Sequence, residues 1–181
     1  MREKIADYSV KKMLTAALFT GLTIVGSQMK IPFLLVPVTF QTFFVILAGF
    51  VLGKRYGLLS QVAFVFLGLV GLPVFSGGGG IGYVLKPSFG FILGFLPCSY
   101  FIGHFAKQAD GLFKTLALAL CGSLIVYIVG VPYMYIIMRN IMHIGDLAYV
   151  LKNGFLLFIP GDIFKCVLVS LVLANLRKIK I

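Results

Sequence analysis

Six long apolar stretches, separated by short charged segments, constrain the fold of this chain more than any other feature of its sequence. A helix needs about 20 apolar residues to cross the roughly 30 Å of hydrocarbon in a bilayer. Each stretch is long enough or nearly so, and the charged segments are too short to fold alone. We therefore predict an all-α integral membrane protein. The stretches are residues 13–29, 31–53, 56–85, 87–106, 115–138 and 153–176.

Proline and glycine refine the ends of these spans. Pro32 and Pro37 place the start of the second helix near Val38. The third stretch ends in "GLPVFSGGGGIGYVL", which cannot continue a helix, so we expect residues 71–86 to form a long ordered loop. The prediction is a single six-helix domain over residues 1–181, with spans at 13–29, 38–53, 56–71, 87–106, 115–138 and 155–176.

The distribution of Lys and Arg predicts the orientation. With both termini cytoplasmic, the inner segments carry eleven of these residues and the outer segments four, with Lys165 set aside as intramembrane. This is the positive-inside bias of a multi-pass protein, here expected in the plasma membrane of a prokaryotic cell. The loops 30–38, 71–86 and 139–154 then lie together outside, over a central cavity. The N-terminus lacks the cleavage site of a signal peptide.

Composition excludes several other classes of protein. Only 12% of the residues are charged, against about 25% in soluble domains. The net charge of +11 follows from topology, since no basic patch is interleaved with aromatic residues, and we expect no nucleic-acid partner. Three cysteines and two isolated histidines show no metal or redox spacing, so we expect no cofactor and no metal.

An acid and a base occupy the last apolar span. Asp162 and Lys165 each cost about 2.5–3.5 kcal/mol at the centre of a membrane helix, so they require burial and a partner. Their i, i+3 spacing puts both on one helical face. Pro160 near the first helical position places Asp162 in the first turn, where the helix dipole favours an anion. The pair either contacts a ligand or a coupled ion, or fixes helix packing as an internal ion pair.

The segment 72–88, "LPVFSGGGGIGYVLKPS", is the second candidate for a binding site. Its glycines allow close approaches that side chains would block. The flanking Phe75 and Tyr83 favour a packed loop that faces a ligand over a flexible linker. The glycines concerned are Gly77, Gly78, Gly79 and Gly80.

No ATPase or catalytic motif accompanies these candidates. A Walker A loop requires G-x4-G-K-[ST], but Gly53-Lys54 is followed by Arg55. No Ser-His-Asp, zinc or paired-carboxylate arrangement is present. We therefore expect a protein that is not an enzyme.

Two further segments carry weaker signals. "IPFLLVPVTFQTFF", residues 31–44, is an apolar loop that leads to Thr39 and Gln41 at the outer mouth, where Gln41 offers both a donor and an acceptor. The presence of Thr39 is explained equally well if its side chain caps the helix. In the first span, Ala17 and Gly21 form a small-xxx-small pair that suits either a partner helix or packing inside the bundle.

Three segments together resemble the BioY family of biotin transporters. They are "PVTFQTFFVILAGFVLG" (37–53), "GLPVFSGGGGIGYVLKPSFGFILGF" (71–95) and "PGDIFK" (160–165), in the order and spacing of the family. BioY proteins are substrate-binding S components of energy-coupling-factor (ECF) transporters. The resemblance implies a six-helix protein that captures biotin from outside, while a transmembrane T component and two ATP-hydrolysing subunits power its release into the cell.

The resemblance also implies roles for particular residues. Asp162 and Lys165 face the binding cavity, and the loops 76–83 and 31–41 close over the ligand. Ala17 and Gly21 correspond to the small residues that contact the T component. The chain departs from many relatives at Lys86-Pro87-Ser88, before the fourth span. It also lacks an Asn that some relatives carry in the Gly-rich loop. Backbone groups or Lys86 are expected to make the ligand contact of that Asn instead.

The chemistry of biotin suits these residues. A buried Asp accepts from the ureido N–H groups, and Lys donates to the ureido oxygen or pairs with the carboxylate. Phe75, Tyr83 and Phe158 are candidates to pack on the bicyclic core. Two alternatives stay open: a self-sufficient carrier with Asp162 as its proton site, and a membrane scaffold that transports nothing.

Overall fold

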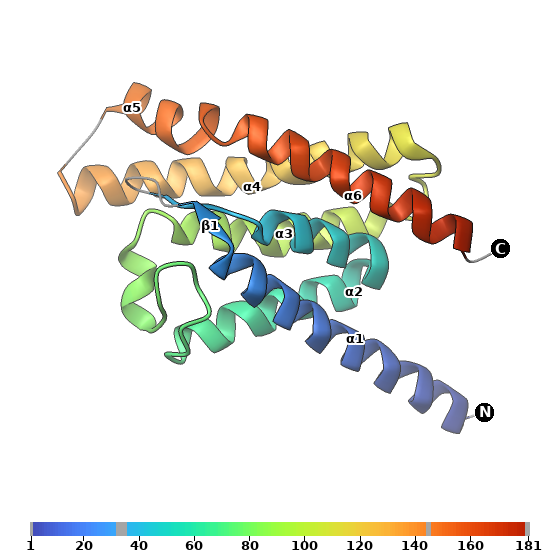
Figure 1. Ribbon diagram of the computed structural model, residues 1–181. Helices are drawn as coiled ribbons and strands as arrows, with labels where there is room; N and C mark the ends of the chain where they lie inside the picture. Colours follow the sequence, from blue (N-terminus) through green and yellow to red (C-terminus); the bar gives the residue numbers. More distant parts are fainter. Residues whose placement is uncertain (1, 32–35, 144–145, 180–181) are drawn as a thin grey trace.

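The chain forms a helical bundle with both termini at the same end (Figure 1). The structure, a computed structural model, describes residues 2–31, 36–143 and 146–179. This confirms the all-α prediction. The helices are α1 (Arg2–Gln28), α2 (Gln41–Leu69), α3 (Phe89–Phe105), α4 (Leu112–Asn140), α5 (Leu147–Leu151) and α6 (Ile159–Ile179).

Length and hydropathy identify a membrane protein. Within the described residues, three helical segments are long and apolar enough to cross a bilayer: Gln41–Leu69, Leu112–Asn140 and Leu147–Arg177. Phe89–Phe105 is a shorter apolar helix. Large apolar side chains such as Phe66 cover the outside of the bundle, as expected for a surface that faces lipid and not water. Six spans and the orientation of the termini stay predictions.

The expected spans 38–53 and 56–71 are the two halves of α2. Gly53 has φ +74° and ψ 179°, which interrupts the helix. A Cβ atom added to Gly57 would lie 3.3 Å from the Cα atom of Gly49, although residues eight apart in a straight helix are about 12 Å apart. The chain therefore reverses at Gly53, and the halves 41–52 and 54–69 pack against each other.

The differences from the expected starts are largest at α1 and in the segment before α6. α1 begins at Arg2 instead of residue 13, because the charged N-terminal segment continues the helix of the first span. The last span was expected from residue 155, but α5 and a π-helical turn (Lys152–Leu156) precede α6, which begins at Ile159. Asp162 lies in the first turn of α6, as expected.

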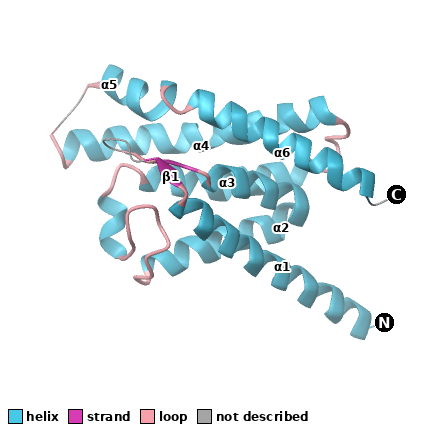
Figure 2. Ribbon diagram, in the orientation of Figure 1, coloured by secondary structure: helices cyan, strands magenta, loops and turns pink. Residues whose placement is uncertain are grey.

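Two connections lie in the half of the bundle away from the termini (Figure 2). Strand β1 (Lys30–Ile31) pairs antiparallel with β2 (Val38–Thr39), with Lys30 opposite Thr39. Residues 32–35, part of the loop 31–41 that is expected to close over the ligand, lie outside the described residues. The segment 71–86 holds a 3-10 helix (Ile81–Leu85) and an isolated bridge from Phe75 to Gly78.

Close packing of α3 on the turn of α2 gives a first prediction. A Cβ atom at Gly103 would lie 2.4 Å from the carbonyl carbon of Gly53 and from the backbone N of Lys54. Gly103→Ala should therefore destabilise the protein by about 1–3 kcal/mol, measured as a lower Tm in detergent. Gly21→Ala is the control, because nothing lies within 4 Å of its added Cβ. Equal Tm values for the two variants would contradict this packing.

Candidate functional site

A cavity opens among the start of α2, the loop 71–86, and helices α3, α4 and α6. It encloses about 510 Å³ of space, counting the part that opens to solvent. Charged, polar and aromatic side chains line it together, which suits a small ligand with both apolar and polar groups. The lining residues are Val36, Pro37, Thr39, Gln41, Thr42, Ser76, Ser88, Phe91, Ile92, Phe95, Val126, Tyr127, Phe158, Asp162 and Lys165.

Asp162 and Lys165 form an ion pair at the base of this lining. Their side chains are only 12% and 6% exposed. Lys165 Nζ also donates to the backbone oxygen of Thr39 at 3.1 Å and lies 3.5 Å from Thr42 Oγ1. The ammonium group therefore ties α6 to the start of α2, and its three donors all have partners within the protein.

The second carboxylate oxygen of Asp162 accepts from the Tyr127 hydroxyl on α4. A carboxylate has about four lone-pair sites, and the contacts with Lys165 and Tyr127 use two. Asp162 thus keeps capacity to accept from N–H groups of a ligand. The arrangement fixes the carboxylate from two helices while leaving part of its acceptor capacity toward the cavity.

Gln41 contributes an unpaired donor. The Thr39 hydroxyl donates to Gln41 Oε1 at 2.9 Å, while Gln41 Nε2 has no partner among the described residues. The residue is 3% exposed, and a buried polar group without a partner costs about 1–3 kcal/mol. A ligand acceptor at this position would remove that cost. The alternative of helix capping by Thr39 is not seen, because Phe40 is the N-cap and no side chain caps α2.

Aromatic rings form the apolar side of the cavity. The ring of Phe91 lies 6.2 Å from that of Phe158 and 6.3 Å from that of Tyr127, between centroids. Phe95 and Ile92 continue this wall along α3. The cavity therefore offers aromatic and aliphatic surface on one side and hydrogen-bonding groups on the other.

The expected residues of the Gly-rich loop divide into two groups. Gly77, Tyr83 and Lys86 line a neighbouring cavity, which shares Pro37, Ser76 and Ser88 with the central one. By contrast, the described lining of the two cavities does not include the other four expected residues, which are Phe75, Gly78, Gly79 and Gly80.

Phe75 and the glycines after it shape the loop instead. Phe75 is 1% exposed and packs on Gly68, where an added Cβ would lie 2.0 Å from the Phe75 ring. Gly78 and Gly80 have φ of +114° and +95°, which side chains rarely adopt. An added Cβ at Gly79 would lie 2.0 Å from the oxygen of Leu72. These positions require glycine for the backbone of the loop.

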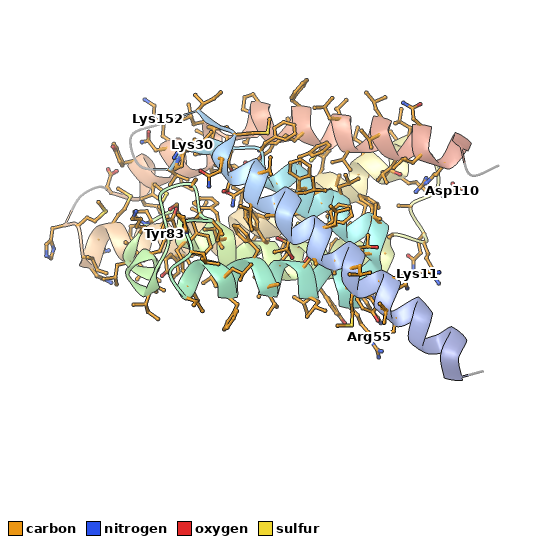
Figure 3. All side chains as sticks on the ribbon, turned by 60° about the horizontal axis from the view of Figure 1, so that its bottom comes forward. Lys11, Lys30, Arg55, Tyr83, Asp110 and Lys152 are labelled. Atoms are coloured by element: carbon orange, nitrogen blue, oxygen red, sulfur yellow. The ribbon has the colours of Figure 1, made fainter. Side chains whose placement is uncertain are left out.

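Two lysines hold this loop beside the cavity. Lys30 Nζ donates to the backbone oxygen of Ser76, and Lys86 Nζ donates to that of Gly77 at 2.9 Å. The Lys86 ammonium also lies 4.7 Å from the centre of the Tyr83 ring. Figure 3 shows Lys30 and Tyr83 toward the same end of the bundle. The loop is therefore fixed both to the β1–β2 hairpin and to the start of α3.

Tyr127 is the main site residue that sequence reasoning missed. Tyrosine is common in apolar spans, so it did not stand out within residues 115–138. The available signal was its hydroxyl, which needs a partner when buried far from either end of a span. Ser88, Phe91 and Phe95 were missed for a similar reason, since none is unusual in its segment.

Ala17 and Gly21 lie on α1, away from the cavity. Ala17 is exposed, and nothing lies within 4 Å of a Cβ added to Gly21. The other face of α1 packs on α2, where Thr20 Oγ1 donates to the oxygen of Ser60 at 2.9 Å. The small pair therefore leaves open space on the surface of the bundle, and its role in contacting a partner stays a prediction.

Taken together, the apolar helices and the buried cavity with polar and aromatic walls define a small-ligand-binding membrane protein. A family model described as the BioY family matches residues 1–180. The chain belongs to the BioY family.

Relatives and a solved structure agree with this assignment. The chain is 37% identical to a probable biotin transporter BioY of Lysinibacillus sphaericus, over 97% of this chain and 91% of the relative. It is 34% identical to the biotin transporter BioY of Thermotoga maritima, over 95% and 99%. It also resembles the crystal structure of the S-component for biotin from an ECF-type ABC transporter, with a TM-score of 0.83, 32% identity, and coverage of 95% and 93%.

Proposed function

We propose that this protein captures biotin and brings it into the cell as the S component of an ECF-type transporter. The observation that carries the proposal is the cavity in which a fixed carboxylate, a lysine and an unpaired amide donor face aromatic walls. Membership of the BioY family supports biotin as the ligand. The sequence offers no ATPase motif, so in this proposal the ATPase subunits of the transporter supply the energy for transport.

The groups in the cavity match the functional groups of biotin. The free acceptor capacity of Asp162 suits a ureido N–H, and Gln41 Nε2 suits the ureido oxygen or the carboxylate. Phe91 and Phe158 offer surface for the bicyclic core. Lys165 orders Asp162 and the start of α2, and it exchanges one of its partners for the ligand. Lys86 and the loop 76–83 close the outer side.

The membrane topology follows from the same proposal. The two halves of α2, together with α1, α3, α4 and α6, supply six membrane-crossing segments. Lys11 and Arg55 lie toward one end of the bundle, whereas Lys30 and Lys152 lie toward the other (Figure 3). The end that is richer in Lys and Arg, which carries both termini, faces the cytoplasm of a prokaryotic cell. The cavity then opens to the outside, where biotin is captured.

An uptake experiment tests the transport step. Labelled biotin is supplied to cells without biotin uptake of their own, which express this chain with or without a T component and two ATPase subunits. We expect accumulation above background to require the ATPase subunits and to persist with an uncoupler. Uptake by the chain alone that stops with the uncoupler would instead identify a proton-coupled carrier.

The unpaired donor of Gln41 gives a prediction with a matched control. Gln41→Met keeps the size of the side chain but removes Nε2, so we expect biotin affinity to fall about 5- to 30-fold, or about 1–2 kcal/mol. Gln61 is also buried with one unpaired amide atom, but it does not line the cavity. Gln61→Met should keep the wild-type Kd in calorimetric titrations of folded protein. A wild-type Kd for Gln41→Met would contradict the contact.

A further inference from the structure

A second cavity lies at the end of the bundle that carries the termini. It is formed by α1, the reversal of α2 at Gly53 and the C-terminal end of α3, and it encloses about 890 Å³, counting the part open to solvent. Lys12, Lys54, Arg55, His104 and Lys107 line it. No acidic residue belongs to its described lining. The cavity therefore concentrates positive charge from three helices around one space.

Most of this charge is not neutralised by the described part of the protein. Lys165 and Arg177 pair with Asp162 and Asp110 respectively. By contrast, Lys54, Arg55 and Lys107 form no ion pair with a described acid. Like charges held near one another raise the free energy of the protein unless an anion or solvent screens them. The cavity is thus electrostatically complementary to an anion.

Compensation of helix dipoles explains only part of the charge. Lys107 lies just beyond the C-terminal end of α3, where a cation is favourable. Lys54 and Arg55 begin the second half of α2, residues 54–69, and cations at a helix N-terminus are unfavourable. The backbone N–H groups of that N-terminus favour an anion instead. Lys54, Arg55 and Lys107 therefore favour an anion in this cavity, as the N-terminus of this helix does.

The surroundings of the cavity identify a lipid as the source of the anion. Tyr56 also lines the cavity, and its hydroxyl lies 3.2 Å from Ser9 Oγ, joining α2 to α1. Beside it, Met13, Leu14 and Leu59 are 55%, 66% and 44% exposed. Basic pockets at the ends of membrane helices, with apolar helix faces next to them, fit a phosphate headgroup and its acyl chains.

We propose that this basic cavity binds the headgroup of an anionic phospholipid of the leaflet at the termini. The lipid phosphate lies among Lys54, Arg55 and Lys107, and its acyl chains run along the exposed faces of α1 and α2. Binding there anchors the turn at Gly53 against α3. The site is separate from the ligand cavity, so its occupancy does not depend on biotin.

Thermal unfolding of the purified full chain in nonionic detergent tests the site. Dioleoyl phosphatidylglycerol should raise the Tm at about tenfold lower concentration than dioleoyl phosphatidylcholine. The double variant Arg55→Gln/Lys107→Gln should lose this preference. The control Lys11→Gln/Lys114→Gln removes two positive charges elsewhere on the same end and should retain it. The single variants R55Q and K107Q, with intermediate loss expected, are measured alongside in case the double variant folds poorly.

Four results would overturn the proposal. One is equal stabilisation of the wild type by the two lipids. Another is an equal loss of preference in both double variants, which would indicate a general effect of charge at this end. A third is a similar rise of Tm with glycerol 3-phosphate alone, which would identify a site for soluble anions. The fourth is an unchanged lipid preference in R55Q and K107Q, which would show that these two residues do not hold the headgroup.

Discussion

Lys165→Ala is expected to weaken biotin binding by more than tenfold, about 1.4 kcal/mol. The variant removes the ammonium that pairs with Asp162 and donates to Thr39, and it leaves a buried carboxylate without its counter-charge. Breaking a buried pair from one side costs about 3–5 kcal/mol, so the Tm of the ligand-free protein should fall as well. Calorimetric titration and thermal unfolding in detergent measure the two effects separately.

Asp162→Asn, the second half of this test, distinguishes ligand contact from a structural ion pair. An amide keeps the size of the side chain but leaves Lys165 unpaired and accepts fewer hydrogen bonds, so the affinity should again fall more than tenfold. If the pair only fixes helix packing, both variants lower the Tm but keep the wild-type Kd. The double variant D162N/K165A would then recover stability without any change in binding.

Gly79→Ala is expected to disrupt the loop beside the cavity. Its Cβ atom would lie 2.0 Å from the backbone oxygen of Leu72, and backbone cannot move aside as a flexible side chain can. We expect a loss of stability of about 1–3 kcal/mol or more and a large fall in biotin affinity, because Ser76 and the Phe75 packing shift with the loop. The measurements are Tm and Kd in detergent.

Gly82→Ala is the matched control from the same loop. Nothing lies within 4 Å of its added Cβ, and its backbone needs no positive φ. This variant should keep both Tm and Kd near the wild-type values. Equal losses in the two variants would show that the loop does not depend on the close approach of Gly79 to Leu72.

Hydropathy predicted an all-helical membrane protein correctly, because apolar membrane helices leave a strong signal in single sequences. The charges at Lys54 and Arg55 divided the 38–71 region into two expected spans. The reversal at Gly53 did not follow from these charges, because it depends on one backbone conformation. The start of α6 beside Pro160 agrees with the sequence, but α5 and the π-helical turn before it were not predicted, because they depend on packing.

The candidate site was predictable where a residue is costly in its environment. Asp162 and Lys165 stood out because charges in an apolar span require a reason. Tyr127 did not, since its requirement for a partner arises only from the depth at which it is buried. The glycines of the loop were recognised as necessary, but composition cannot tell contact with a ligand from a backbone requirement. In this structure, Gly78, Gly79 and Gly80 meet a backbone requirement.

Direct titration of the purified protein with biotin tests the central claim most directly. In detergent, with no other subunit present, we expect saturable binding of one biotin per chain at submicromolar ligand, and a Kd raised more than tenfold in Lys165→Ala. Absence of saturable binding at submicromolar biotin, in protein that is folded and monodisperse, would contradict biotin capture by this cavity.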